Sequence, residues 1–141
     1  MNIGIASDHK GYKKKEKLLK YLLKKYKNVI DYGTNSLDSV DYTDYANKLC
    51  DDISSGKIDY GILICYTGIG MSIAANKHKN IRCAKVDTNE EAKLSRLHNN
   101  ANVIAISMKK YTFEMKDFID IFLNTEFSNE ERHIRRINKM L

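Results

Sequence analysis

Short runs of aliphatic and β-branched residues alternate with longer amphipathic stretches along the whole chain. The short runs predict strands over residues 2–6, 28–32, 60–65, 82–86 and 103–107. The third run, YGILIC, is apolar enough for a strand buried on both faces of a sheet. Between these runs, apolar residues recur every three or four positions, which predicts helices.

Several helices have recognisable features. In the lysine-rich segment 10–27, leucines and tyrosines recur at helical spacing, so its lysines are expected to form the solvated face of an amphipathic helix. Thr88 and Ser128 each stand three residues before a glutamate, which is the spacing of a capping box. They predict a helix that ends near His98 and a terminal helix over about 129–140.

Five strands that alternate with helices are typical of parallel βαβ units. We therefore predict an α/β fold with a doubly wound five-stranded parallel sheet, helices on both faces, and a single domain over residues 1–141. Such sheets bind ligands in the crevice beyond the carboxyl ends of their strands. The chemistry is expected in segments 7–11, 33–44, 65–72, 87–88 and 107–109.

Composition excludes several classes of protein. No apolar run approaches the roughly 20 residues that cross a bilayer, so no membrane partner is expected. Cys50, Cys65 and Cys83 are odd in number and widely spaced, which indicates free thiols in a reducing cytoplasm. The formal net charge of +6 permits an anionic partner, but the lysines are dispersed along helices rather than gathered for nucleic acid. The four histidines lack zinc-ligand spacing, so no metal is expected.

Cys65 ends the third predicted strand and is followed by Gly68 and Gly70. Glycines allow a sharp turn whose N–H groups approach a ligand, and the following helix adds its N-terminus to this anion hole. A cysteine there is expected to have thiolate character and to act as a base or nucleophile. The alternative is that Cys65 only fills the core, the role expected for Cys50 and Cys83.

Other candidate residues lie elsewhere along the chain. Asp8, with the neighbouring histidine and lysine, could bind hydroxyls and phosphate, or it could cap the next helix. His98 is either a partner for a helix dipole or a general acid and base. Three of the five arginines, including Arg132 and Arg136, fall in the last ten residues, which indicates a phosphate site or a solvated helix.

The fragments that carry a resemblance follow one another through nearly the whole chain. They are residues 7–11 (SDHKG), 41–42 (DY), 61–77 (GILICYTGIGMSIAANK), 94–103 (LSRLHNNANV) and Arg132-His133 with Arg136. The ordered set resembles the type B ribose-5-phosphate isomerases and the related galactose-6-phosphate isomerase subunits. This resemblance implies a pentose-phosphate-pathway enzyme that is a homodimer or a dimer of dimers, acts on a sugar phosphate and uses no metal or cofactor.

The resemblance also implies roles for individual residues. Cys65 would move a proton between C2 and C1, Thr67 would assist at the sugar oxygens, and His98 would open the sugar ring. The backbone at Gly68 and Gly70 would form the anion hole for the enediolate. The remaining expected contacts are Asp8, Tyr42 and Asn99 with the sugar, and His9, Lys109, Arg132 and Arg136 with phosphate, the arginines across a dimer interface.

Two positions depart from the family pattern. Tyr66 stands where the family usually has glycine, so its side chain must point away from the sugar or reshape the rim of the pocket. Lys109 stands where many members have an arginine, and a lysine keeps the charge but loses the bidentate fork.

Two alternatives remain at the level of sequence. One is an isomerase for a six-carbon sugar phosphate, such as galactose 6-phosphate or allose 6-phosphate. The other is a non-catalytic nucleotide- or nucleic-acid-binding module, which the basic charge and the α/β pattern would allow.

Overall fold

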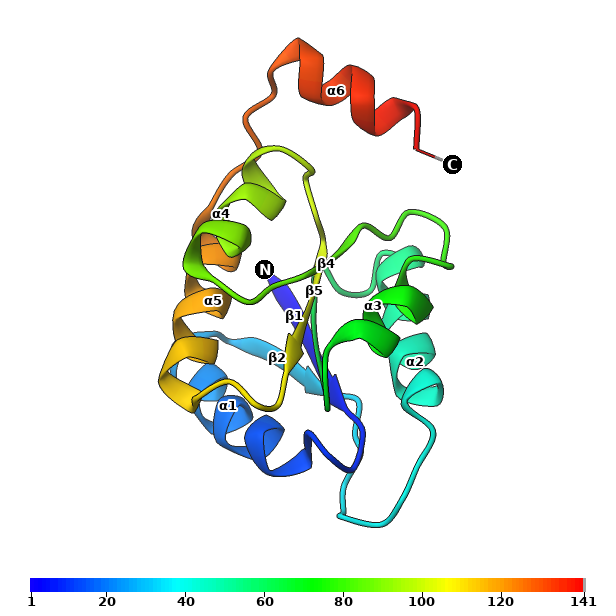
Figure 1. Ribbon diagram of the computed structural model, residues 1–141, viewed down its shortest axis with the longest axis vertical. Helices are drawn as coiled ribbons and strands as arrows, with labels where there is room; N and C mark the ends of the chain where they lie inside the picture. The colour runs from blue at the N-terminus through cyan, green and yellow to red at the C-terminus, as the bar shows by residue number, and fades with distance from the viewer. Residues whose placement is uncertain (141) are drawn as a thin grey trace.

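The computed structural model describes residues 1–140 and consists of one five-stranded parallel sheet with helices on both faces (Figure 1). This confirms the predicted doubly wound fold. The elements are β1 (Asn2–Ser7), α1 (Tyr12–Lys25), β2 (Asn28–Asp31), α2 (Tyr42–Ser54), β3 (Tyr60–Cys65), α3 (Ile69–Ala75), β4 (Cys83–Lys85), α4 (Asn89–Leu97), β5 (Val103–Ser107), α5 (Thr112–Asn124) and α6 (Glu131–Asn138).

The strand order is β2-β1-β3-β5-β4. From β1 the chain moves outward to β2 and then returns to the other side of β1 to form β3. The connections therefore diverge between β1 and β3, and ligands of open α/β sheets bind at such a switch point. The carboxyl ends of these two strands are Ser7 and Cys65. The topology thus places Cys65 where a crevice is expected.

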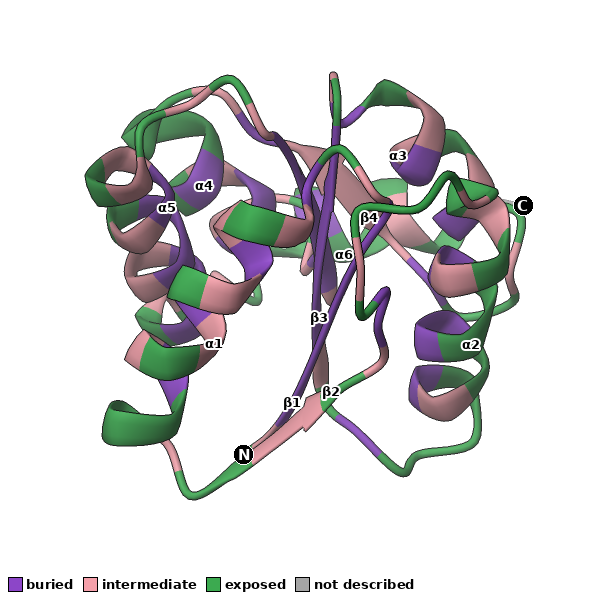
Figure 2. Cartoon of the chain, turned by 90° about the horizontal axis from the view of Figure 1, so that it is seen from below, coloured by how far each residue is buried: buried purple, intermediate pink, exposed green. Residues whose placement is uncertain are grey.

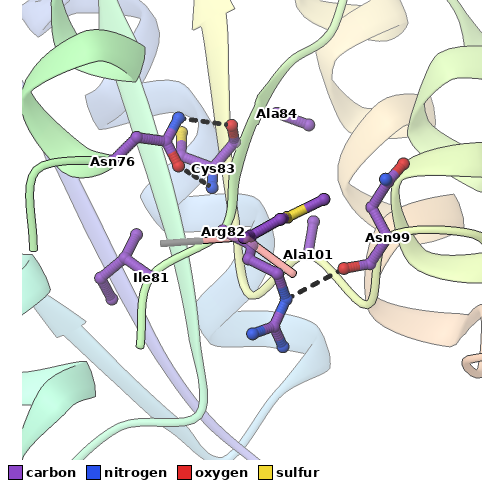
Figure 3. Close-up of a pocket in the computed structure, with 8 residues that line it drawn as sticks. Asn76, Ile81, Arg82, Cys83, Ala84, Asn99 and Ala101 are labelled. Carbon is purple, nitrogen blue, oxygen red and sulfur yellow. Dashed lines mark hydrogen bonds between the residues drawn. The ribbon is translucent and has the colours of Figure 1, made fainter. Parts of the chain in front are cut away.

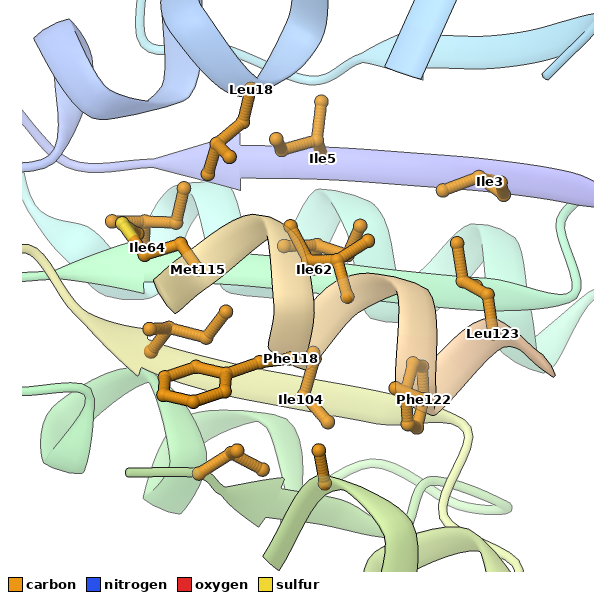
Figure 4. Packing of buried hydrophobic residues seen from close by; sticks show 14 of the residues in the cluster. Ile3, Ile5, Leu18, Ile62, Ile64, Ile104, Met115, Phe118, Phe122 and Leu123 are labelled. Carbon is orange, nitrogen blue, oxygen red and sulfur yellow. The ribbon is translucent and has the colours of Figure 1, made fainter. Parts of the chain in front are cut away.

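Alternate strand residues supply two cores, one on each face of the sheet. Ile62 and Ile64 pack toward α1, α4 and α5, and Figure 4 shows this cluster with Phe118 and Phe122 of α5. Leu63 and Cys65 pack toward α2 and α3. Burial is concentrated in the sheet and on the inner faces of the helices (Figure 2). Because side chains alternate along a strand, Cys65 must face α3 rather than α1.

Lys15 contradicts the expectation that the lysines of α1 are solvated. Its side chain is 0% exposed, and its Nζ lies 2.8 Å and 2.9 Å from the carboxylate oxygens of Asp31 and 2.9 Å from Glu16. Asp31 also accepts a hydrogen bond from the Gly33 N–H at 2.9 Å. A buried ammonium is tolerated only when it is paired in this way, so the ion pair fastens α1 to the end of β2.

Asp31→Ala is expected to lower the free energy of unfolding by about 3 kcal/mol, because it strands the buried Lys15 ammonium. Lys15→Met should cost less, because methionine fills the space and the Asp31 carboxylate, whose side chain is 27% exposed, can be hydrated. Glu16→Ala removes only a surface partner and is the matched control. Urea denaturation measures all three, and a larger loss for Lys15→Met than for Asp31→Ala would contradict this account.

The two predicted capping boxes have different outcomes. Thr88 caps α4, since its side chain accepts a hydrogen bond from the Glu91 N–H at 3.1 Å. Ser128 does not cap α6, which begins at Glu131 and is shorter than predicted. Its Oγ accepts from the Glu130 N–H and lies 2.8 Å from Nδ1 of His133. Ser128 therefore orients the His133 side chain of α6 instead of capping the N-terminus of this helix.

None of the helices in the described part of the chain has the length and apolar character needed to cross a membrane.

Candidate active site

A cavity of about 320 Å³ opens at the carboxyl ends of β1 and β3. Five of its lining residues were singled out from the sequence, and they come from the end of β1, the start of α2, the end of β3 and the start of α3. The cavity is lined by Asp8, Tyr42, Cys65, Tyr66, Thr67, Ile69 and Gly70. The fold thus brings together groups that lie up to 62 positions apart between Asp8 and Gly70.

The turn after Cys65 wraps its backbone around the thiol. Gly68 donates its N–H to Cys65 Sγ at 3.2 Å. Gly68 has φ of +80°, and a Cβ there would lie 3.2 Å from the backbone of Ile106 and Ser107 in β5. Only glycine fits this close approach. The turn at Gly68 therefore packs directly against the backbone of β5, next to the buried Cys65 thiol.

Backbone donors of this turn are available to a ligand. In the described residues, the N–H groups of Thr67 and Gly70 have no hydrogen-bond acceptor, whereas the Ile69 N–H donates to Thr67 Oγ1 at 3.2 Å. Tyr42 lies across Gly70, where a Cβ would be 2.8 Å from the tyrosine ring. Preorganised donors of this kind stabilise an oxyanion. Of the two expected donors, the Gly70 N–H is available, whereas the Gly68 N–H is directed at Cys65 Sγ. The anion hole therefore stays a prediction.

Asp8 and His9 hold the loops beside the cavity. Asp8 accepts a hydrogen bond from the Gly11 N–H at 2.9 Å and so closes the turn between β1 and α1. The alternative role of Asp8 as the helix cap is wrong, because Gly11 occupies the N-cap position of α1. His9 accepts the Val40 N–H at Nδ1, at 3.2 Å, which ties down the loop before α2.

Lys109 follows the carboxyl end of β5, on the side of the Cys65 cavity, but four other predicted site residues lie at the opposite edge of the sheet. His98 and Asn99 follow α4 and precede β5, beside the amino ends of the strands. Strands rise about 3.3 Å per residue, so the two ends of the six-residue β3 are about 17 Å apart. Arg132 and Arg136 lie on α6, which stands beyond the same edge, while the strand arrows point away from it (Figure 1). Within one chain, His98 therefore cannot reach Cys65.

A second cavity of about 360 Å³ lies at this amino edge (Figure 3). Its lining comprises Asn76, Ile81, Arg82, Cys83, Ala84, Asn99, Ala101 and Met140. Arg82 donates from Nε to the Asn99 carbonyl at 3.0 Å and from Nη2 to the Asn100 carbonyl at 2.9 Å. It thereby shapes the loop that carries Asn99. The sequence pattern marks Arg82 only as a strand residue. The scarcity of arginine in the chain is a signal that would have singled out its structural role.

A family model described as Ribose/Galactose Isomerase matches residues 3–140. The chain belongs to this family. The Escherichia coli ribose-5-phosphate isomerase B is 37% identical, over 96% of this chain and 91% of the relative. This family membership removes the alternative of a non-catalytic nucleic-acid-binding module.

Solved structures of family members superpose over nearly the whole chain. A ribose 5-phosphate isomerase from Thermotoga maritima has a TM-score of 0.95 at 46% identity, covering 98% of this chain and 95% of its own. Ribose-5-phosphate isomerase B from Mycoplasma genitalium, solved with bound ribulose 5-phosphate, has a TM-score of 0.92 at 41% identity, covering 98% of this chain and 92% of its own. The single-domain architecture is thus that of the ribose/galactose isomerases.

Two histidines meet at the amino edge of this isomerase. The rings of His98 and His133 have their centroids 4.4 Å apart, and His133 is 5% exposed. Burial lowers the pKa of His133, and the neighbouring His98 and Arg132 lower it further. His133 is therefore expected to be neutral near pH 7 and to pack against His98. Arg132 pairs with Glu130 at 3.0 Å on the exposed side of α6.

Cys50 and Cys83 have the environments of packing residues. Burial raises the pKa of each thiol to about 12. Near neutral pH neither thiol carries appreciable negative charge, so neither is suited to proton transfer. In the described residues, no cluster of three or more metal-ligating side chains is present.

Proposed function

We propose that this chain is a type B ribose-5-phosphate isomerase that interconverts ribose 5-phosphate and ribulose 5-phosphate. The observation that carries the proposal is the Cys65 thiol beneath a turn with unpaired N–H donors at the switch point of the sheet. The E. coli relative bears this activity in its name, and the Mycoplasma genitalium structure holds the ketose product. Proton transfer between adjacent carbons requires no cofactor, and the proposal assigns the acid, the base and the anion hole to residues of this chain.

The proposed reaction has two stages. The closed sugar ring opens when an imidazole, that of His98, moves a proton from O1 to the ring oxygen. The Cys65 thiolate then removes the proton from C2 and returns it to C1, while the hydroxyl proton of O2 passes to O1 with the Thr67 hydroxyl assisting at these two oxygens. Negative charge builds on the carbonyl oxygen, where the Thr67 and Gly70 N–H groups and the Thr67 hydroxyl would bind it. One such donor contributes about 3 kcal/mol in other enzymes.

A homodimer would bring the two edges of the sheet together. In a two-fold dimer the carboxyl edge of each chain can face the amino edge of the other chain, so that two equivalent sites form. Cys65, Asp8, His9, Tyr42 and Lys109 of one chain would then act with His98, Asn99, Arg132 and Arg136 of the other. This proposal extends the expected trans contact from the arginines to His98.

Exposed apolar side chains support such an interface. Ile69 and Ile73 project from α3 beside the Cys65 cavity, and Ile73 is 57% exposed. Ile134 and Met140, at the amino edge, are also exposed large apolar residues. Exposed apolar groups that flank a site are typical of interaction surfaces.

All three cysteines are free, which supports the proposed cytoplasmic location.

The test is turnover of ribose 5-phosphate to ribulose 5-phosphate in the presence of a chelator, with allose 6-phosphate and galactose 6-phosphate as comparison substrates. We expect the chelator to have no effect and kcat/KM to be highest for the five-carbon sugar. A higher kcat/KM for either six-carbon sugar would contradict the assignment.

A further inference from the structure

The rim of the Cys65 cavity carries an aromatic ring with two ammonium groups beside it. Tyr66 is 48% exposed and lines the cavity directly after the thiol. The Nζ of Lys109 lies 4.2 Å from the centroid of the Tyr66 ring, and the Nζ of Lys10 lies 5.9 Å from it. Both distances are within the range of cation–π attraction. Among residues 1–140, neither ammonium forms an ion pair with a carboxylate.

One buried hydroxyl fixes the backbone of both partners. Ser107, at the end of β5, donates its Oγ–H to the Tyr66 carbonyl at 2.8 Å and accepts the Lys109 N–H at 3.1 Å. The Met108 N–H donates to the Cys65 carbonyl at 2.8 Å. The turn after Cys65 and the segment after β5 are therefore joined. Ser107 therefore fixes the backbone positions from which the Tyr66 and Lys109 side chains extend toward each other.

The cavity needs positive charge at its rim. Asp8 is the acidic residue among those that line it, and its carboxylate would repel a phosphorylated sugar. A lysine side chain is flexible, and ordering it on binding costs free energy that a preorganised charge avoids. An aromatic ring that already holds the ammonium supplies this preorganisation.

We propose that Tyr66 is a positioning residue that holds the Lys109 ammonium, and more weakly that of Lys10, at the mouth of the cavity to bind the substrate phosphate. The proposal rests on the proposed function for the identity of the substrate. Tyr66 acts here through the face of its ring, whereas its hydroxyl has no part. The tyrosine is thus a working part of the phosphate site rather than an obstruction.

A double-mutant cycle on Tyr66 and Lys109 tests this. Tyr66→Leu and Lys109→Gln are each expected to raise KM for ribose 5-phosphate about two- to fivefold with little change in kcat, the size of an exposed cation–π contact. The double variant should be only slightly worse than Lys109→Gln alone, because Tyr66 works mainly through Lys109 and only weakly through Lys10. Tyr66→Phe keeps the ring and should retain the parent KM. Tyr111→Leu, which alters an exposed tyrosine outside the cavity, is the matched control.

The affinity for inorganic phosphate, measured by calorimetry on the same proteins, gives a readout that needs no turnover. If the unaltered enzyme failed to convert ribose 5-phosphate, the proposed function would fall, and the phosphate cycle would still decide the role of Tyr66. Additive losses in the double variant would overturn the positioning role. So would a Tyr66→Phe protein as weak as Tyr66→Leu, or an unchanged KM and phosphate affinity in Tyr66→Leu.

Discussion

Replacing Cys65 with serine is expected to lower kcat for ribose 5-phosphate by roughly 10²- to 10⁴-fold, the contribution typical of a general base. A hydroxyl is a far weaker base than a thiolate near neutral pH. Serine is smaller than cysteine and can still accept the Gly68 N–H, so the turn and substrate binding should survive. Turnover, exchange of the C2 hydrogen with solvent, and phosphate affinity together separate lost chemistry from lost binding.

Cys50→Ala and Cys83→Ala are the matched controls. Both thiols have a pKa raised to about 12 by burial, so their removal should alter stability and leave kcat intact. If Cys65→Ser kept near-native turnover and exchange, Cys65 would have no role as the base. Thr67 or the Asp8 carboxylate would then be the group to examine.

Mixing two inactive proteins, Cys65→Ala and His98→Asn, is expected to restore activity. Random exchange of equal amounts makes about half of the dimers mixed, and each mixed dimer has one site with both lesions and one with neither. Activity should therefore return to about a quarter of the unaltered level. Cys65→Ala with Arg136→Ala should behave in the same way.

The discriminating control is the pair His98→Asn and Arg136→Ala. Both residues lie at the amino edge of the sheet, so a mixed dimer carries one lesion in each site and should remain inactive. Native mass spectrometry verifies that subunits have exchanged. Recovery in this control pair, or none in the Cys65 pairs after verified exchange, would refute the composite site.

Local patterns were enough to predict the five strands and the segments at their carboxyl ends. Periodicity and turn residues report on near neighbours, and the run YGILIC is buried on both faces as its composition indicates. The ion pair of Lys15 with Asp31 escaped prediction because a buried lysine has the same local pattern as a solvated one. Ser128 has capping-box spacing, yet packing against His133 decides its bond.

The division of the candidate site was also beyond local patterns. His98 and Cys65 each resemble a family position, but their separation depends on the direction in which α4 ends and β5 begins. The strand register, in which Gly61 lies opposite Val103 and Cys65 opposite Ser107, sets the start of β5 level with the start of β3 and so places His98 and Cys65 at opposite edges.

The separation of the two edges also has a genetic consequence, if each site is shared between two chains. A substitution that inactivates the carboxyl edge can be rescued by a second allele that is damaged only at the amino edge. Two alleles damaged at the same edge cannot rescue each other. Alleles that alter site residues without unfolding the chain would then fall into two complementation groups, and the map of those groups would trace the two ends of the sheet.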